Sequence, residues 1–166
     1  NMEMIDPLQK LSFVTEDNQI MQQEHSVSGI MPYVAHYMPK AQIIPLVISN
    51  SMTSSEFEQL LNWLKAVAAD DNVLLVGAVD FSHYLNSQEA ANKDKQTQKA
   101  LENFSTEKIL NYGNDHLDSP PVVALILESM KANGYNNLDI VNNTNSAEVM
   151  GFEPIEVTSY FEILVW

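Results

Sequence analysis

Two apolar runs of strand length most strongly limit how this chain can fold. Residues 41–49 (AQIIPLVIS) and 72–79 (NVLLVGAV) are nearly continuous in apolar side chains, a pattern typical of parallel strands buried on both faces. Between them, residues 54–69 place phenylalanine and leucine side chains at helical spacing. A helix between two buried strands predicts a βαβ crossover.

The rest of the chain adds helices and further strands to this unit. Helices are predicted over residues 26–37, 88–103, 106–112 and 120–133, and strands over 138–141 and 156–166. Neither a linker nor an internal repeat divides the sequence. We therefore expect one α/β domain over residues 1–166, with a central mixed sheet flanked by helices.

Composition excludes several classes of function. The chain has 22 Asp and Glu against eight Lys, lacks Arg, and carries a formal net charge of −14. A nucleic-acid partner is not expected, because phosphate binding needs clustered cations. The absence of Cys excludes disulfides and thiolate metal ligands within the chain, and it fits a reducing or an oxidising compartment equally well. Membrane contact is not expected either, since no apolar run approaches the roughly 18–20 residues of a spanning helix.

A polar segment follows the second apolar run. Asp80, Ser82 and His83 lie in DFSHY at residues 80–84, directly after the predicted strand. Open α/β sheets bind ligands beyond the carboxyl ends of their strands, which makes this segment a candidate active-site loop. The alternative is a hydrogen-bonded loop histidine, with Asp80 capping a turn.

A second candidate precedes the predicted helix 120–133. His116 and Asp118 in NDHLDSPP could offer an imidazole and a carboxylate to a metal ion. The simpler interpretation is that Asp118 or Ser119 caps the helix, as Asp and Ser commonly do.

Several short motifs, taken in order, resemble a known family. They are EHS at residues 24–26, IIP at 43–45, DFSHY at 80–84 and VTSY at 157–160. Together they resemble the Memo-like family, also called AmmeMemoRadiSam system protein B. The resemblance implies a fold similar to class III extradiol dioxygenases, in which a mostly parallel sheet lies between helices in three layers, with a metal pocket at one edge. It covers only the C-terminal part of the family's usual length, so we expect the domain to be incomplete at its N-terminus.

The resemblance also implies roles for individual residues. His25 and His83 match pocket histidines that act as acid–base groups, a task suited to imidazole near neutral pH. Asp80 is expected to act with His83, and Glu24 with His25, as carboxylates that fix the orientation of a histidine ring.

The metal ligands are expected to be incomplete. Two family histidines come from segments that this sequence lacks, and a third ligand comes from a T-x-C-G-x-x-P segment. Aligned through Pro120, that cysteine position holds His116; aligned through Pro121, it holds Leu117. His116 or the nearby Asp118 is thus the candidate replacement. Iron, copper or zinc is expected only if further ligands exist upstream of Asn1.

Two functions follow as alternatives. The first is part of a metal-dependent, dioxygenase-like oxidoreductase with His25 and His83 in its pocket. The second is a non-catalytic Memo-like module that has lost the metal site and binds a small molecule or a protein. A third possibility is that the chain is a fragment whose sheet exposes an edge where the missing N-terminal portion would pair, and a second copy of the chain is then expected to cover that edge.

Overall fold

The computed structural model describes residues 2–152 and 154–166. The chain divides into two compact units, of which one ends at Val47 and the other runs from Ile48 to Trp166. Each unit is described by itself below.

The first unit consists of three helices and an extended segment. The helices are α1 (Met2–Gln9), α2 (Asn18–Gln23) and α3 (His25–Tyr37). Side-chain caps start two of them: Asp17 accepts hydrogen bonds from the Gln19 and Ile20 amides, and Glu24 accepts one from the Ser26 amide. Among the described residues of this unit, Leu8 alone is buried. Local capping thus contributes more here than core packing.

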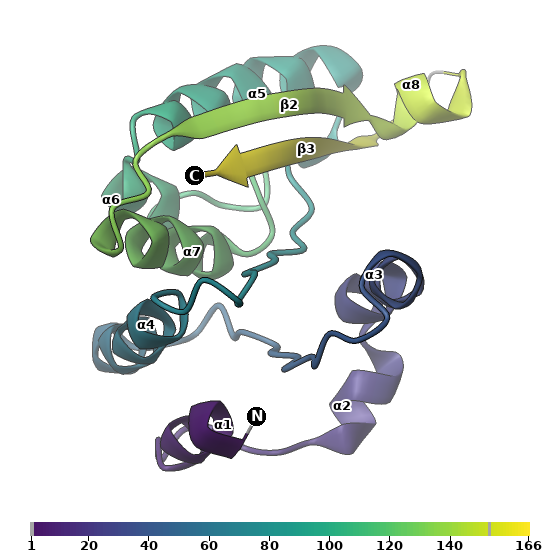
Figure 1. Ribbon diagram of the computed structural model, residues 1–166. Coiled ribbons are helices and arrows are strands. Elements are labelled where there is room, and N and C mark those ends of the chain that lie inside the picture. The colour runs from purple at the N-terminus through teal and green to yellow at the C-terminus, as the bar shows by residue number, and fades with distance from the viewer. Residues whose placement is uncertain (1, 153) are drawn as a thin grey trace. The chain divides into compact units, whose positions relative to one another are not determined.

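The second unit contains the remaining elements and a sheet. They are α4 (Ser54–Val67), β1 (His83–Leu85), α5 (Ser87–Glu102), α6 (Thr106–Leu110), α7 (Pro120–Ala132), β2 (Leu138–Asn145), α8 (Ser146–Met150) and β3 (Val157–Val165). The strands are antiparallel in the order β1-β3-β2. Strands β2 and β3 form the long ribbon seen in Figure 1, and α5 packs against both.

A continuous apolar core holds this second unit together. Its buried members come from loops and helices: Phe81, Ala100, Leu101, Ile109, Leu117 and Leu127. Phe161, Ile163 and Val165 of β3 pack against them. Each fully buried Leu or Ile contributes about 1.5–3 kcal/mol relative to an exposed position. The core therefore fixes the loops that carry Phe81 and Leu117.

The α/β class is confirmed, whereas the mostly parallel three-layer sheet is not. All five predicted helices form within a few residues of the predicted bounds, as do β2 and β3. The described sheet, however, is antiparallel and has three strands. Residues 41–49 and 72–79 are extended but are assigned to no strand. The predicted βαβ crossover is therefore absent from the described structure.

The exposure of residues 72–79 explains this difference. One side of the segment meets α7 so closely that a Cβ added to Gly77 would lie 2.5 Å from Ile126 Cδ1. Leu74 and Val76 are instead 67% and 57% exposed. A buried parallel strand needs a neighbour along each edge, and the segment instead borders an apolar groove of about 450 Å³ beside α7 and β3.

Candidate functional site

His83 lies at the start of β1 with its ring buried and its tautomer fixed by the backbone. The residue is 8% exposed, and Nδ1 lies 2.6 Å from the carbonyl oxygen of Phe81. Because a carbonyl oxygen only accepts, Nδ1 must carry the proton. In the neutral ring, Nε2 is then left with the lone pair. His83 thus has the form of a proton acceptor or metal ligand.

The loop before His83 runs beside the segment that leads into α7. Phe81 pairs with Leu117 in an isolated antiparallel bridge, and the Asp118 amide donates to the Asp80 carbonyl oxygen over 2.9 Å. The His83 amide also donates to the Asn114 carbonyl oxygen. These bonds bring the two polar motifs identified in the sequence, DFSHY and NDHLD, to one place.

Asp118 is the most perturbed carboxyl group in this place. Burial raises its pKa above the ordinary range, the negative charge of Asp80 raises it further, and His83 opposes both effects. Its Oδ1 atom is buried and has no hydrogen-bond partner among the described residues. The protonated form of Asp118 is therefore favoured more than in an exposed aspartate.

Tyr160 of β3 extends the same cluster. Burial raises the pKa of its hydroxyl, and the charge of Asp80 raises it further. The hydroxyl accordingly remains a hydrogen-bond donor throughout the neutral range. The cluster of Asp80, His83, Asp118 and Tyr160 is called the strand-end cluster below.

Backbone strain occurs beside this cluster. Tyr84 has φ = 60°, in the left-handed region that costs a non-glycine residue about 1–3 kcal/mol. It lies where the pairing of β1 with β3 shifts register between His83 and Leu85, and its ring meets that of His83 edge-on at 4.6 Å. Such strain is concentrated at functional sites.

His116 has a different environment from Asp118, although two residues separate them. The residue is 5% exposed. Its ring stacks on Tyr112 at 3.9 Å between centroids and forms a hydrogen bond with Thr97 Oγ1 through Nδ1 at 2.9 Å. Burial lowers its pKa and Lys93 lowers it further, against the charge of Asp115, which raises it. The packed, neutral ring resembles a core histidine more than an open ligand.

The helix-capping interpretation of this segment holds only in part. Ser119 is the N-cap residue of α7 but makes no side-chain capping bond, and Pro120 starts the helix. The Ser119 hydroxyl donates instead to Asn50 Oδ1, and Asn50 Nδ2 donates to the Asp118 carbonyl oxygen. The segment is thus tied to the loop before α4.

Asp94 of α5 is a buried carboxylate that no sequence motif marked. It is 5% exposed, and its Oδ1 accepts hydrogen bonds from Ser82 and Ser159 over 2.6 and 2.7 Å. Its Oδ2 accepts one from Asn143 Nδ2 over 3.1 Å. The signal available in the sequence was an acidic residue on the otherwise buried face that α5 turns to the sheet, beside Ala90, Thr97 and Leu101.

Comparison with known proteins agrees with these motifs. A family model described as "Memo-like protein" matches residues 1–163. The chain belongs to the Memo-like family. Its match spans both compact units.

Curated relatives of this Memo-like chain are bacterial and archaeal. A MEMO1 family protein of Aquifex aeolicus is 27% identical over 157 residues, covering 90% of this chain and 57% of that protein. One of Methanobrevibacter smithii is 27% identical over 145 residues, covering 84% of this chain and 51% of that protein. The chain thus spans about half the length of the curated relatives it matches.

A metal of the kind the family resemblance implies does not fit the residues described. Across residues 2–152 and 154–166, no group of three His, Cys, Asp or Glu side chains could hold a metal ion. The pKa of His116 is shifted by the charges of Lys93 and Asp115, whereas that of Asp118 is shifted by Asp80 and His83. The pair expected to replace the family's cysteine is therefore split between two surroundings.

His25 is the first residue of α3 and is exposed. Glu24, expected to orient it, mainly caps the helix: its Oε1 accepts from the Ser26 amide over 2.7 Å. That bond lowers the pKa of Glu24, and the neighbouring His25 makes a smaller contribution in the same direction. His25 lies in the first unit and His83 in the second, so each is placed only within its own unit.

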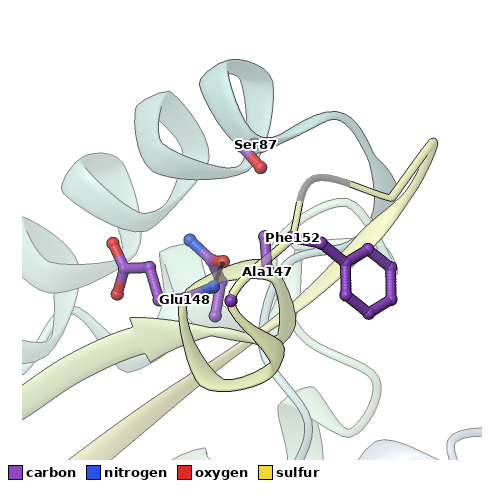
Figure 2. A pocket seen from close by; sticks show the side chains of 6 residues that line it. Ser87, Ala147, Glu148 and Phe152 are labelled. Atoms are coloured by element: carbon purple, nitrogen blue, oxygen red, sulfur yellow. Dashed lines mark hydrogen bonds between the residues drawn. The ribbon is translucent and has the colours of Figure 1, made fainter.

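A shallow pocket of about 350 Å³ lies between the start of α5 and α8. Figure 2 shows Ser87, Ala147, Glu148 and Phe152 around it. Glu148 is already occupied, since its Oε2 accepts from Thr144 over 2.6 Å. The pocket contains no histidine, and the strand-end cluster is the better candidate for chemistry.

None of the helices described is both long and apolar enough to span a bilayer.

Proposed function

We propose that this Memo-like chain supplies the acid–base part of a dioxygenase-like pocket, in which His83 accepts a proton from a hydroxyl group of a small ligand. The observation that carries the proposal is the bond from His83 Nδ1 to the Phe81 carbonyl oxygen. This bond leaves Nε2 as the basic atom of a buried ring.

The charges around His83 favour this role. When Nε2 takes a proton, the ring becomes an imidazolium, which the carboxylate of Asp80 and that of Asp118, when it is ionised, stabilise. Asp118 already interacts with His83. The Tyr160 hydroxyl can donate a hydrogen bond to the same ligand. His25, in the first unit, is a second candidate acid–base group.

The same charges indicate the class of ligand. With Asp80 and Asp118 at the site and a net charge of −14, an anionic ligand would be repelled. No Arg is present to form a bidentate clamp on a carboxylate or phosphate. An uncharged molecule with an acidic hydroxyl, such as a phenol, fits best.

The test uses catechol as the probe and NMR chemical-shift changes to follow its binding. His83→Asn retains a side-chain N–H that can reach the Phe81 carbonyl but removes the basic Nε2. We expect catechol to bind about tenfold more weakly to this variant, since a hydrogen bond to a charged group is lost. His36→Ala, at an exposed site on α3, is the matched control and should bind normally. Equal binding by H83N and the unchanged chain would overturn the proposal.

A second function is favoured by the absence of a three-ligand group in the described residues. In that case the chain is a non-catalytic binding module. Metal analysis and oxygen uptake with catechol, measured on the whole gene product, separate the two. Stoichiometric iron, copper or zinc, with uptake that falls about 10²–10⁴-fold in H83N, supports the oxidoreductase. Catechol binding without metal or uptake supports the module.

A further inference from the structure

We infer that Asp94 is a positioning residue for His83: its buried carboxylate, bonded to Ser82 and Ser159, holds the loop that fixes the histidine tautomer. The inference rests on the proposed function of His83 and adds a residue to it. Asp94 lies on α5, 11 positions after His83 in the sequence. None of the bonds described joins Asp94 to His83 or to its Nε2 atom.

The two serine bonds define the direction of each hydroxyl. An ionised carboxylate only accepts, so both Ser82 Oγ and Ser159 Oγ must donate to Asp94 Oδ1. All three side chains are buried, with both serines fully so. Hydrogen bonds to an ionised group in such surroundings are stronger than those between neutral groups.

The same two serines are also joined through the backbone. The Ser159 amide donates to the Ser82 carbonyl oxygen over 2.8 Å, and the Phe81 amide donates to the Ser159 carbonyl oxygen over 3.1 Å. Asp94 thus closes a ring of bonds between the loop before β1 and the strand β3. Ser82 cannot shift without breaking a bond to a buried charge.

Ser82 is the residue that connects this ring to the site. It lies between Phe81 and His83 in the sequence. The Nδ1–H group of His83 donates a hydrogen bond to the carbonyl oxygen of Phe81. A shift of Ser82 would change the geometry of that 2.6 Å bond. Without it, the proton is free to move to Nε2, and His83 loses its acceptor atom.

Asn143 allows the role of the Asp94 carboxylate to be tested by exchanging the two side chains, so that the pair still holds one carboxylate and one amide. Asn143 Nδ2 donates to Asp94 Oδ2, so Asp94→Asn places two amide donors against each other, and Asn143→Asp places two carboxylates there. The double variant D94N/N143D restores one donor and one acceptor and keeps the net charge of the original chain. It loses the 3.2 Å bond from Asn143 to the Tyr160 carbonyl oxygen, and the hydroxyls of Ser82 and Ser159 then donate to a neutral amide oxygen instead of a carboxylate.

The experiment follows the His83 ring by NMR with ¹⁵N-labelled histidine in the full chain. The measurements are the tautomer, read from the two ring nitrogens, and the exchange rate of the Nδ1 proton with water. We expect exchange to be about tenfold faster in D94N and in N143D and to return part of the way in the double variant, which restores the donor–acceptor pair but not the charge that accepts the serine bonds. Asp139→Asn is the charge-matched control, because Asp139 bonds only the Trp166 indole at the exposed face of β2 among the bonds described.

A purely structural role for Asp94 predicts a different pattern. If D94N lowers the melting temperature but leaves the His83 tautomer and exchange rate unchanged, the inference is wrong. It is also wrong if the double variant exchanges as fast as either single variant. Should D94N not fold, Ser82→Ala removes the bond next to His83 and must speed the exchange.

The outcome is separable from that of the proposed function. Catechol binding that is insensitive to H83N would overturn the role of His83 as a base, while the effect of Asp94 on the ring could still be present. Normal exchange in D94N, with catechol binding lost in H83N, would overturn only the role of Asp94.

Discussion

The two compact units carry family motifs of equal clarity but hold them by different means. In the unit that begins at Ile48, the His83 ring is hydrogen-bonded to the backbone carbonyl of Phe81. This unit has a buried apolar core that includes Ile109, Leu117 and Leu125. In the unit that ends at Val47, His25 is exposed at the first position of a helix without a buried residue. A motif therefore indicates the family, while the core beneath it determines how firmly its side chains are placed.

The largest test of this difference compares two isoleucines. Ile109 is fully buried and Ile20 is 48% exposed. Replacing Ile109 by Ala leaves a cavity and should lower the free energy of unfolding by about 2–5 kcal/mol. Replacing Ile20 should change it by no more than about 0.5 kcal/mol. Urea denaturation followed by circular dichroism measures both. Similar losses in the two variants would mean that the first unit depends on a core of its own.

Local signals in the sequence predicted one helix of the first unit, α3, and four of the second, α4 to α7. The spacing of apolar residues and the stop at Gly134, which has φ = 91°, predicted α7 to within one residue of its end. The same reasoning missed α1, α2 and α8, because helices of eight, six and five residues are too short to show a clear apolar periodicity.

Non-local structure was harder to predict. Residues 72–79 have the composition of a buried strand, but whether they pair depends on which segments lie beside them, and composition alone does not contain that information. His83 was predicted to follow the end of a strand formed by this run, but the run is assigned to no strand, and the role of His83 stays a prediction. The coupling of His83 to Asp118 and the anchoring of its loop by Asp94 were not predicted, because these residues are 35 and 11 positions away in the sequence and only the fold brings them near the loop.

A smaller effect distinguishes the helix caps of the two units. Thr53 caps α4 in a capping box with Glu56, in which each side chain bonds the backbone of the other, and α4 buries Leu60, Leu61 and Leu64. Thr53→Ala should therefore lower the global free energy of unfolding by about 1 kcal/mol. Asp17→Ala removes the cap of α2, which has no buried residue. That loss should stay local, visible as faster amide exchange at Ile20 without a change in the global denaturation midpoint.

The smallest effect concerns pH. Bonds from the Thr53 amide and hydroxyl lower the pKa of Glu56, and the bond from the Ser26 amide lowers that of Glu24, each from an ordinary value of 4.5. A carboxyl group whose pKa is depressed by folding stabilises the protein above that ordinary value. The stabilisation is lost as the pH falls through the lowered pKa, because the folded state must then take up a proton it resists.

Gln substitutions isolate these two contributions. Between pH 6 and pH 3, Glu56→Gln should flatten the fall of the global melting temperature, since α4 packs on α7. Glu24→Gln should leave that curve unchanged and flatten only the pH dependence of amide exchange at Ser26. Thermal melts and hydrogen exchange at several pH values measure the two responses. If E24Q shifted the global curve as much as E56Q, the capping of α3 would be coupled to cooperative unfolding, and the contrast between a core-supported and a locally capped unit would fail.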